Sequence, residues 1–232
     1  MKRECVMITG SSRGLGRQLA LVFARNNHDI ILHGRDKEKL AIVREEVLRS
    51  GVDCDICSGD LGKNHTIEEL CKVAFKKDVA VLINNAGTSS GSIEAAEHER
   101  KLPLDEIAVE QIDEILTTNL LAAIKLTKGI YPLFLSKKSG TIININSLLG
   151  REPRAFQSIY CASKWGLRGF TDSLRLEAAN HNIRVIGVYL SRIKTKVYFT
   201  AGMEPENVAR QVYAVYQSAD ASEVVLDGRG KP

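Results

Sequence analysis

Residues 5–25 read CVMITGSSRGLGRQLALVFAR, a short apolar run that passes through a glycine-rich turn into an amphipathic helical pattern. Glycines allow a tight turn and let backbone amides come close to a pyrophosphate group. The N-terminus of the helix that follows adds unpaired N–H donors and a partial positive charge. A purely structural turn would also use glycines, but the position between the first strand and the first helix of an α/β chain favours phosphate binding.

The alternation of strand and helix continues along the chain. Candidate strands occupy residues 5–9, 29–33, 53–58, 79–84, 141–146, 184–189 and 223–226, and candidate helices occupy residues 14–25, 36–49, 66–75, 108–135, 159–180 and 205–216. This order predicts βαβ units and a parallel sheet that is covered on both faces. With right-handed crossovers, we expect an α/β fold with a doubly wound Rossmann-type sheet of about seven strands. No linker or repeat divides the sequence, which predicts a single domain over residues 1–232.

Composition and charge narrow the function classes. The 232 residues include 32 basic and 28 acidic side chains, a net charge of +4 that is mixed along the chain. No basic block with interleaved aromatic residues occurs, which argues against nucleic acid as a partner. The N-terminus lacks the apolar stretch of a signal peptide, and no apolar run has the length of a membrane span. These observations predict a cytoplasmic protein that does not bind membranes.

The cysteines do not form a recognisable framework. The five cysteines are scattered, and the C-x-x-C of Cys54 and Cys57 lies in a strand pattern. In a strand, residues i and i+3 point to opposite faces. Because no second ligand pair follows, we expect small packing residues and no metal site.

Further motifs follow the glycine loop in a fixed order. They are Asp60-Leu61 after the third strand, Asn84-Asn85-Ala86-Gly87 after the fourth, Asn119 in a long helical pattern, Ser147 after the fifth strand, and Tyr160-Cys161-Ala162-Ser163-Lys164 at the start of the next helix. A Tyr-x-x-x-Lys pair alone carries little information. The ordered set resembles the short-chain dehydrogenase/reductase family, single-domain type, from Val6 to about Asp227.

The chemistry of the last motif can be argued from its residues. Tyr160 and Lys164 are four residues apart, so they share one face of a helix. A phenol with an ordinary pKa near ~10 is a poor acid or base at neutral pH, and a neighbouring ammonium is expected to lower that pKa. Ser147, at the carboxyl end of a parallel strand, can donate a hydrogen bond to a carbonyl oxygen that gains negative charge.

The resemblance implies a catalytic role for four residues. Tyr160 is the implied proton donor in reduction and the base in oxidation, and Lys164 also binds the nicotinamide ribose. Ser147 orients the substrate oxygen, and Asn119 holds a water in a proton relay. Structural roles remain open for each: a buried amide bonded to the backbone for Asn119, a helix cap for Ser147 and a packing aromatic for Tyr160.

The residues after the second strand bear on the cofactor. An NAD enzyme usually places an acid there to bind the adenosine ribose, but the corresponding residue is Gly34. Arg35 follows, and Arg13 lies in the glycine loop, so two guanidiniums are positioned for a 2′-phosphate. Either arginine could instead be a solvated surface charge. The pattern favours NADP(H).

The expected cofactor-binding set joins these residues to those implied by the resemblance. It comprises Gly10, Ser12, Arg13, Gly14, Leu15, Gly16, Arg35, Asp60, Leu61, Asn84, Ala86, Gly87, Tyr160, Lys164, Ile193 and Thr195.

The sequence departs from the family pattern in three places. Leu190-Ser191 replaces the usual Pro-Gly after the sixth strand, which leaves the backbone before Ile193 less constrained. The segment from Gly87 to Asn119 is longer than usual and contains the charged run EAAEHERK, which is either a solvated loop or a substrate-side or subunit-contact insertion. The segment 196–204 is short, which predicts an open site.

Two functions remain as hypotheses. The first is an NADPH-dependent oxidoreductase that transfers a hydride between the nicotinamide and a small-molecule carbonyl or alcohol. The second is a non-catalytic NADP(H)-binding sensor or interaction module on the same fold. The four catalytic candidates together favour the enzyme. By analogy with relatives that pair through helices matching 108–135 and 159–180, we expect a homodimer or homotetramer. The substrate is not specified by the sequence.

Overall fold

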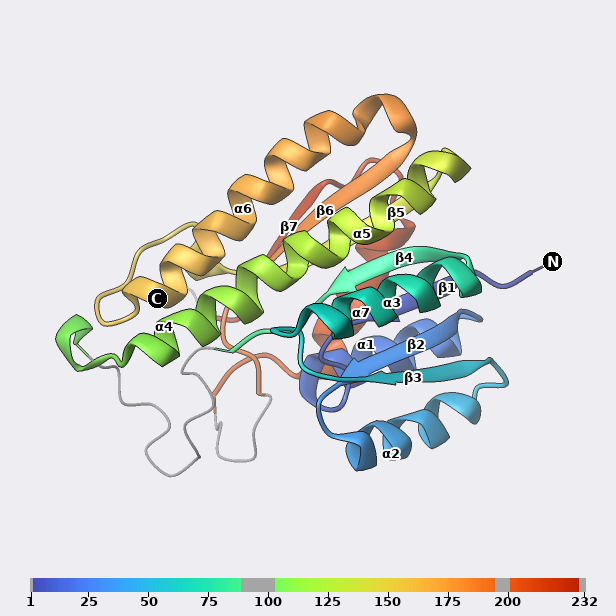
Figure 1. Ribbon diagram of the computed structural model, residues 1–232, viewed down its shortest axis with the longest axis horizontal. Coiled ribbons are helices and arrows are strands. Elements are labelled where there is room, and N and C mark those ends of the chain that lie inside the picture. The colour runs from blue at the N-terminus through green and yellow to red at the C-terminus, as the bar shows by residue number, and fades with distance from the viewer. Residues whose placement is uncertain (1, 89–102, 195–200, 230–232) are drawn as a thin grey trace.

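The computed structural model describes residues 2–88, 103–194 and 201–229 (Figure 1). Its centre is a seven-stranded sheet in the order β3-β2-β1-β4-β5-β6-β7, and every neighbouring pair is parallel. The strands are β1 (Cys5–Ile8), β2 (Asp29–Gly34), β3 (Cys54–Ser58), β4 (Val79–Asn84), β5 (Gly140–Ser147), β6 (Ile183–Leu190) and β7 (Glu223–Leu226). The predicted doubly wound Rossmann-type sheet is confirmed.

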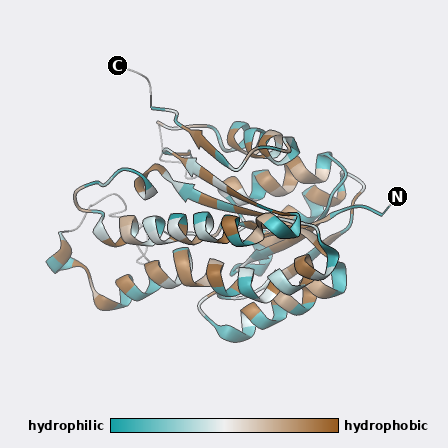
Figure 2. Ribbon diagram, turned by 90° about the horizontal axis from the view of Figure 1, so that it is seen from above, coloured by the Kyte–Doolittle hydropathy of each residue, from teal (hydrophilic) through white to brown (hydrophobic). Residues whose placement is uncertain are grey.

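Helices cover both faces of this sheet. They are α1 (Gly14–Arg25), α2 (Lys37–Leu48), α3 (Asn64–Lys77), α4 (Val109–Leu116), α5 (Ala122–Lys137), α6 (Ser158–Ala178) and α7 (Pro205–Gln217), with short turns η1 (Leu104–Glu106), η2 (Thr117–Leu121), η3 (Leu148–Gly150) and η4 (Ala179–His181). The strands alternate their side chains between two hydrophobic clusters, one against α1, α2 and α7 and the other against α3, α5 and α6. Hydrophobic and hydrophilic bands alternate along the helices, as expected for amphipathic covers (Figure 2).

One predicted helix differs from the structure. The pattern over residues 108–135 predicts a single helix, but η2 is a π-helical turn that separates α4 from α5. A π turn contains one extra residue, and such turns often occur at functional sites. The buried Asn119 lies inside it. Hydrophobic periodicity cannot locate this turn, because it is fixed by contacts with distant residues.

The carboxyl ends of the strands share one edge of the sheet. Thr9 follows β1, Asn84 ends β4 and Ser147 ends β5. The order reverses between β1 and β4, which both lie at the centre of the sheet. In open α/β sheets, ligands bind outside the carboxyl ends at such a switch point, so the fold brings the predicted motifs to one place.

His33 near the end of β2 gives a test of the packing. Its side chain is buried. Burial lowers the pKa of His33 to about 4, and a hydrogen bond with the Gly59 backbone and the charge of Asp60 oppose this only in part. Between about pH 6.5 and pH 4 the unfolded chain therefore binds a proton that the folded chain does not, so stability falls as the pH falls.

We expect this histidine to contribute about 3 kcal/mol of acid destabilisation by pH 4. His33→Leu should reduce the loss of unfolding free energy between pH 7 and pH 4, as measured by urea unfolding at each pH. The exposed His65 supplies the control, since His65→Leu should leave the loss unchanged. Equal pH dependence in wild type and His33→Leu would contradict the assignment.

Candidate active site

The glycine loop is tied to the segment after β4. The Thr9 hydroxyl accepts hydrogen bonds from the backbone N–H groups of Asn85 and Ala86, both at 3.0 Å. The Asn85 amide donates in return to the carbonyls of Thr9 at 2.9 Å and Gly10 at 3.2 Å. Gly10 has a φ of +66°, and a Cβ there would lie 2.9 Å from the Ala86 Cα. The two segments thus form one connected cradle.

The start of α1 fits a phosphate group. A Cβ at Gly16 would lie 2.2 Å from the Gly10 carbonyl oxygen and 2.6 Å from the Asn85 Nδ2, so only glycine fits. Within the described residues no side chain caps α1, and its first turn contains no acidic residue. Its first N–H groups and helix dipole are therefore suited to an anion. The Leu15 side chain is buried in the core, so this residue offers its backbone alone.

The predicted arginines lie where the second strand ends. Arg13 and Arg35 are both exposed, and the Arg35 Nη1 lies 3.8 Å from the Glu114 Oε1 on α4. Ser11 joins the glycine loop to this strand end, because its hydroxyl accepts from the His33 N–H at 2.9 Å. A Cβ at Gly34 would lie 3.3 Å from the Ser12 side chain. The loop and the strand end therefore lie side by side, with both guanidiniums exposed.

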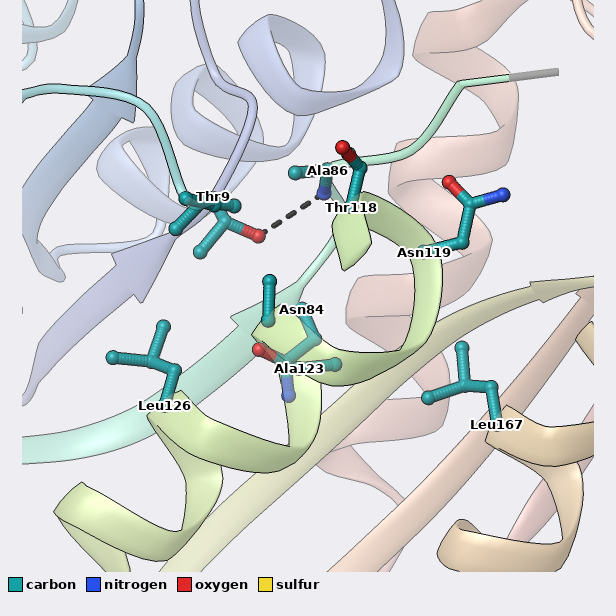
Figure 3. Close-up of a pocket in the computed structure, with 10 residues that line it drawn as sticks. Thr9, Asn84, Ala86, Thr118, Asn119, Ala123, Leu126 and Leu167 are labelled. Carbon is teal, nitrogen blue, oxygen red and sulfur yellow. Dashed lines mark hydrogen bonds between the residues drawn. The ribbon is translucent and has the colours of Figure 1, made fainter. Parts of the chain in front are cut away.

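The residues after β3 follow the sequence prediction in position. Asp60 is exposed, and its Oδ1 accepts from the Gly62 N–H at 2.9 Å. Leu61 is buried. Leu61 lines a small cavity together with residues from three other predicted motifs. Thr9, Asn84, Ala86 and Asn119 represent these motifs in Figure 3. The cavity lining comprises Thr9, Leu61, Asn84, Ala86, Thr118, Asn119, Ala122, Ala123, Leu126 and Leu167.

Gly87 brings the catalytic candidates of two helices together. A Cβ on Gly87 would lie 3.3 Å from the Asn119 Oδ1 and 3.7 Å from the Lys164 Nζ. Asn119 is almost fully buried. Its Oδ1 accepts from the Thr88 N–H, and its Nδ2 donates to the Thr88 carbonyl, both at 2.8 Å. The same Nδ2 donates to the Ser163 hydroxyl at 3.1 Å. The buried amide therefore does bond the backbone, while lying next to Lys164.

Lys164 is a buried cation at the centre of the site. Its Nζ donates to the Ile145 carbonyl at 3.1 Å and lies 5.9 Å from the centroid of the Tyr160 ring. Burial lowers the pKa of Lys164 to about 8. An ammonium so little shielded by water is well placed to act on neighbouring groups.

Tyr160 differs from the electrostatic expectation. Burial raises the pKa of the Tyr160 phenol above its ordinary value, a hydrogen bond with the Ser147 side chain lowers it in part, and the Cys161 thiol adds to the rise. Burial, and not the charge of Lys164, therefore controls the pKa of this phenol. The phenol therefore keeps its proton at neutral pH.

Ser147 has two roles at the end of β5. Its Oγ accepts from the Leu149 N–H at 3.2 Å and so caps η3, as the structural alternative proposed. The same side chain forms the hydrogen bond with Tyr160. A serine that caps a turn is held in place, so the cap also fixes the hydroxyl beside the phenol.

The segment after β6 explains one departure from the family pattern. The Ser191 hydroxyl accepts from the Gly228 N–H at 2.9 Å, so the C-terminal segment holds the position where the family has glycine. Ile193 forms a bridge with Met203. Thr195, the whole charged run EAAEHERK and part of the short segment 196–204 lie outside the described residues.

Sequence reasoning missed several residues that build this site. Asn85 and Thr9 connect the two cofactor-side segments, and Ser163 links Asn119 to α6, because its hydroxyl donates to the Tyr160 carbonyl at 2.7 Å. Asn84 was expected on the cofactor side, but its amide is buried and bonded to Thr127 and Asn144. Asn85 lies in the Asn84-Asn85-Ala86-Gly87 motif, which marks the segment but does not indicate the partners of its side chains.

The described residues contain no group of three or more side chains that could hold a metal ion. Among these residues no helix has both the length and the apolar character that crossing a membrane requires.

Comparisons with known proteins agree with this geometry. An NADPH-dependent pterin aldehyde reductase from Arabidopsis thaliana is 33% identical over 174 residues, which is 74% of this chain and 68% of the relative. A 3-oxoacyl-[acyl-carrier-protein] reductase from Staphylococcus epidermidis is 29% identical over 188 residues, covering 80% of this chain and 73% of the relative.

Solved structures and a family model give the same answer. A metagenomic short-chain oxidoreductase in complex with NADP has a TM-score of 0.84 and 30% identity, with 98% of both chains covered. A short-chain dehydrogenase from Sphingobium yanoikuyae in complex with NADPH has a TM-score of 0.84 and 26% identity, covering 97% of this chain and 88% of the other. The family model described as short chain dehydrogenase matches residues 4–203. The chain therefore belongs to the short-chain dehydrogenase/reductase family.

Proposed function

We propose that this protein is an NADPH-dependent reductase of a small-molecule carbonyl compound. One observation carries the proposal: the Tyr160 phenol is hydrogen-bonded to the Ser147 side chain next to a buried Lys164. The similarity to reductases and to structures holding NADP or NADPH supports it. This arrangement lies at the sheet edge where the glycine loop can hold a dinucleotide.

Each side chain has a role that follows from its surroundings. When bound, the nicotinamide supplies the hydride. Ser147 donates a hydrogen bond to the substrate oxygen and so stabilises the negative charge that develops there. Tyr160 donates its proton to that oxygen. Burial keeps the phenol protonated before the transfer, and the Ser147 hydrogen bond opposes the rise in its pKa that would make it a weaker acid.

Two further residues complete the proposed catalytic set. Lys164 stabilises the phenolate left behind and would bind the nicotinamide ribose when the cofactor is present. The Asn119 side chain holds Thr88 through two hydrogen bonds. Its Oδ1 has a second lone pair, which can accept a hydrogen bond from the relay water expected from the resemblance. The predicted binding set, apart from the Asn84 side chain, would hold the cofactor, and Gly10, Gly14 and Gly16 would form the phosphate cradle.

The arginine pair tests the cofactor assignment. We expect the double variant Arg13→Ala/Arg35→Ala to raise the KM for NADPH between about 10- and 100-fold, because charge-assisted bonds to a 2′-phosphate are lost. The KM for NADH should change little, since NADH lacks that phosphate, and it serves as the internal control. Equal increases for both cofactors would contradict a role in 2′-phosphate recognition.

The reaction itself is tested by a screen of carbonyl compounds, in which NADPH consumption is followed by absorbance and NADH is run in parallel. NADPH oxidation that depends on a ketone or aldehyde supports the proposal. Tight NADPH binding without turnover of any compound would favour the sensor or interaction module. A strong preference for NADH would overturn the cofactor assignment.

Assembly and location complete the proposal. We propose a cytoplasmic homodimer or homotetramer in which the helical segments 108–135 and 159–180 contact a second copy. Trp165 and Leu176 on α6 and Leu121 at the end of η2 are exposed apolar residues on these segments. Sedimentation analysis of the purified protein tests the assembly, and a monomer at all concentrations would exclude it.

A further inference from the structure

A hydrogen-bonded network of buried polar side chains crosses the molecule beneath the active site. The Asn84 Nδ2 donates to the Thr127 hydroxyl at 3.1 Å and to the Asn144 Oδ1 at 2.8 Å. The Asn144 Nδ2 donates to the Thr171 hydroxyl at 2.9 Å, which in turn donates to the Leu167 carbonyl at 2.6 Å. All four polar side chains are buried. The network connects α5, β4, β5 and α6.

Two asparagines of β5 attach the strand to α6. Asn144 and Asn146 alternate with Ile143 and Ile145, which belong to the cluster on the opposite face of the sheet. Both asparagines therefore face α6. The Asn146 Nδ2 donates to the Lys164 carbonyl at 3.1 Å, while Asn144 bonds Thr171. The helix is thus bonded to the strand at two points, in addition to its apolar packing.

These two points lie on the catalytic face of α6. Tyr160, Lys164 and Thr171 are separated by four and seven residues, spacings that place side chains on one face of a helix. Ser147 is the last residue of β5, the strand that also contains Asn144 and Asn146. The bonds therefore set the rotation and the height of Tyr160 and Lys164 relative to Ser147.

Stability alone does not account for this arrangement. A buried polar network lowers the stability of the fold unless every donor and acceptor in it forms a hydrogen bond. Replacing buried polar or charged groups with well-packed apolar groups often leaves the stability unchanged or increases it. Hydrogen bonds are directional, so the network allows only one relative arrangement of the strands and helices that it joins. At this position the arrangement they specify is the spacing between the catalytic groups.

We propose that Thr171, together with Asn144 and Asn146, is a positioning residue that sets the Tyr160–Ser147 geometry. This inference rests on the proposed function in naming Tyr160 as the proton donor. The Ser147 hydrogen bond lowers the pKa of the phenol against the rise caused by burial. A helix that is free to shift weakens that bond, so the pKa of Tyr160 rises further.

The test is Thr171→Val, which keeps the shape and removes the hydroxyl. The matched control is Thr127→Val, which removes an equally buried hydroxyl from the other end of the same network, on α5. The readout is the phenolate absorbance of Tyr160 as a function of pH, isolated by subtracting the titration of Tyr160→Phe. This measurement does not depend on turnover.

We expect the Tyr160 titration of Thr171→Val to move up by about 0.5 pH unit or more and kcat to fall about tenfold. Thr171→Ser should restore both, because the hydroxyl returns, and Thr127→Val should titrate like wild type. Should Thr171→Val fail to fold, Asn146→Ala removes the other attachment and is expected to shift the titration in the same direction.

The outcomes separate the two proposals. A titration shift specific to the α6 attachments supports the positioning role even where no substrate has been identified. Coincident titrations of wild type, Thr171→Val and Thr127→Val overturn it. If in addition Tyr160→Phe abolishes turnover, the proposed reaction stands and only the positioning role fails.

Discussion

Replacing Tyr160 with phenylalanine is expected to lower kcat for carbonyl reduction about 10³-fold, the middle of the range for loss of a general acid. The ring that packs beside Lys164 is retained, so NADPH binding should remain close to that of wild type. The substitution removes only the phenolic hydroxyl, which is the group that exchanges the proton. The measurement is NADPH absorbance during turnover, with cofactor affinity determined separately by fluorescence titration.

Tyr131→Phe is the matched control, because Tyr131 on α5 also has a pKa raised by burial but is not part of the proposed catalytic set. It should leave kcat unchanged. Turnover by Tyr160→Phe at the wild-type rate would exclude the phenol as the proton donor. A parallel loss of NADPH affinity would instead indicate that the hydroxyl holds the cofactor.

The second large effect is expected from Gly16→Ala. The added methyl would lie 2.2 Å from the Gly10 carbonyl oxygen and 2.6 Å from the Asn85 Nδ2, both parts of the cradle. Neither group can give way without breaking the bonds between the two cofactor-side segments. We expect the Kd for NADPH to rise at least about 100-fold, because misplacement of about 1 Å in a positioned site has effects of that size.

Gly169→Ala is the matched control for the added methyl. A Cβ there meets nothing within 4 Å among the described residues, and the position is inside α6. Alanine should stabilise the helix by about 0.5–1 kcal/mol and leave NADPH binding unchanged. Isothermal calorimetry gives the affinities and chemical unfolding gives the stabilities. Wild-type affinity in Gly16→Ala would show that the loop tolerates a side chain and that the cradle is incorrectly assigned.

The sequence was a good guide to elements and motifs because both are local. The alternation of strand and helix predicted the sheet, and the order of β1, β4 and β5 placed their terminal residues at one edge. The spacing of Tyr160 and Lys164 predicted a shared helix face without further knowledge. These inferences use only periodicity and the geometry of parallel strands.

The contacts that decide what each residue does are long-range, and the sequence does not show them. The amide of Asn119 bonds Thr88 and Ser163, which are 31 and 44 residues away along the chain. The amine of Lys164 bonds the Ile145 carbonyl, 19 residues away. The pKa of Tyr160 is controlled by burial, which depends on the packing of the whole site. An amphipathic pattern records which face is buried, but not which polar atom meets which.

The bonds among Thr9, Gly10, Asn85 and Ala86 have a thermodynamic consequence. Four hydrogen bonds join two loops whose bonded residues lie 75 to 77 positions apart in the sequence, and all four form without a ligand. The conformational entropy of these loops is thus lost during folding and not when a nucleotide arrives. A dinucleotide that enters such a preformed cradle therefore loses less of its contact energy to the ordering of these loops.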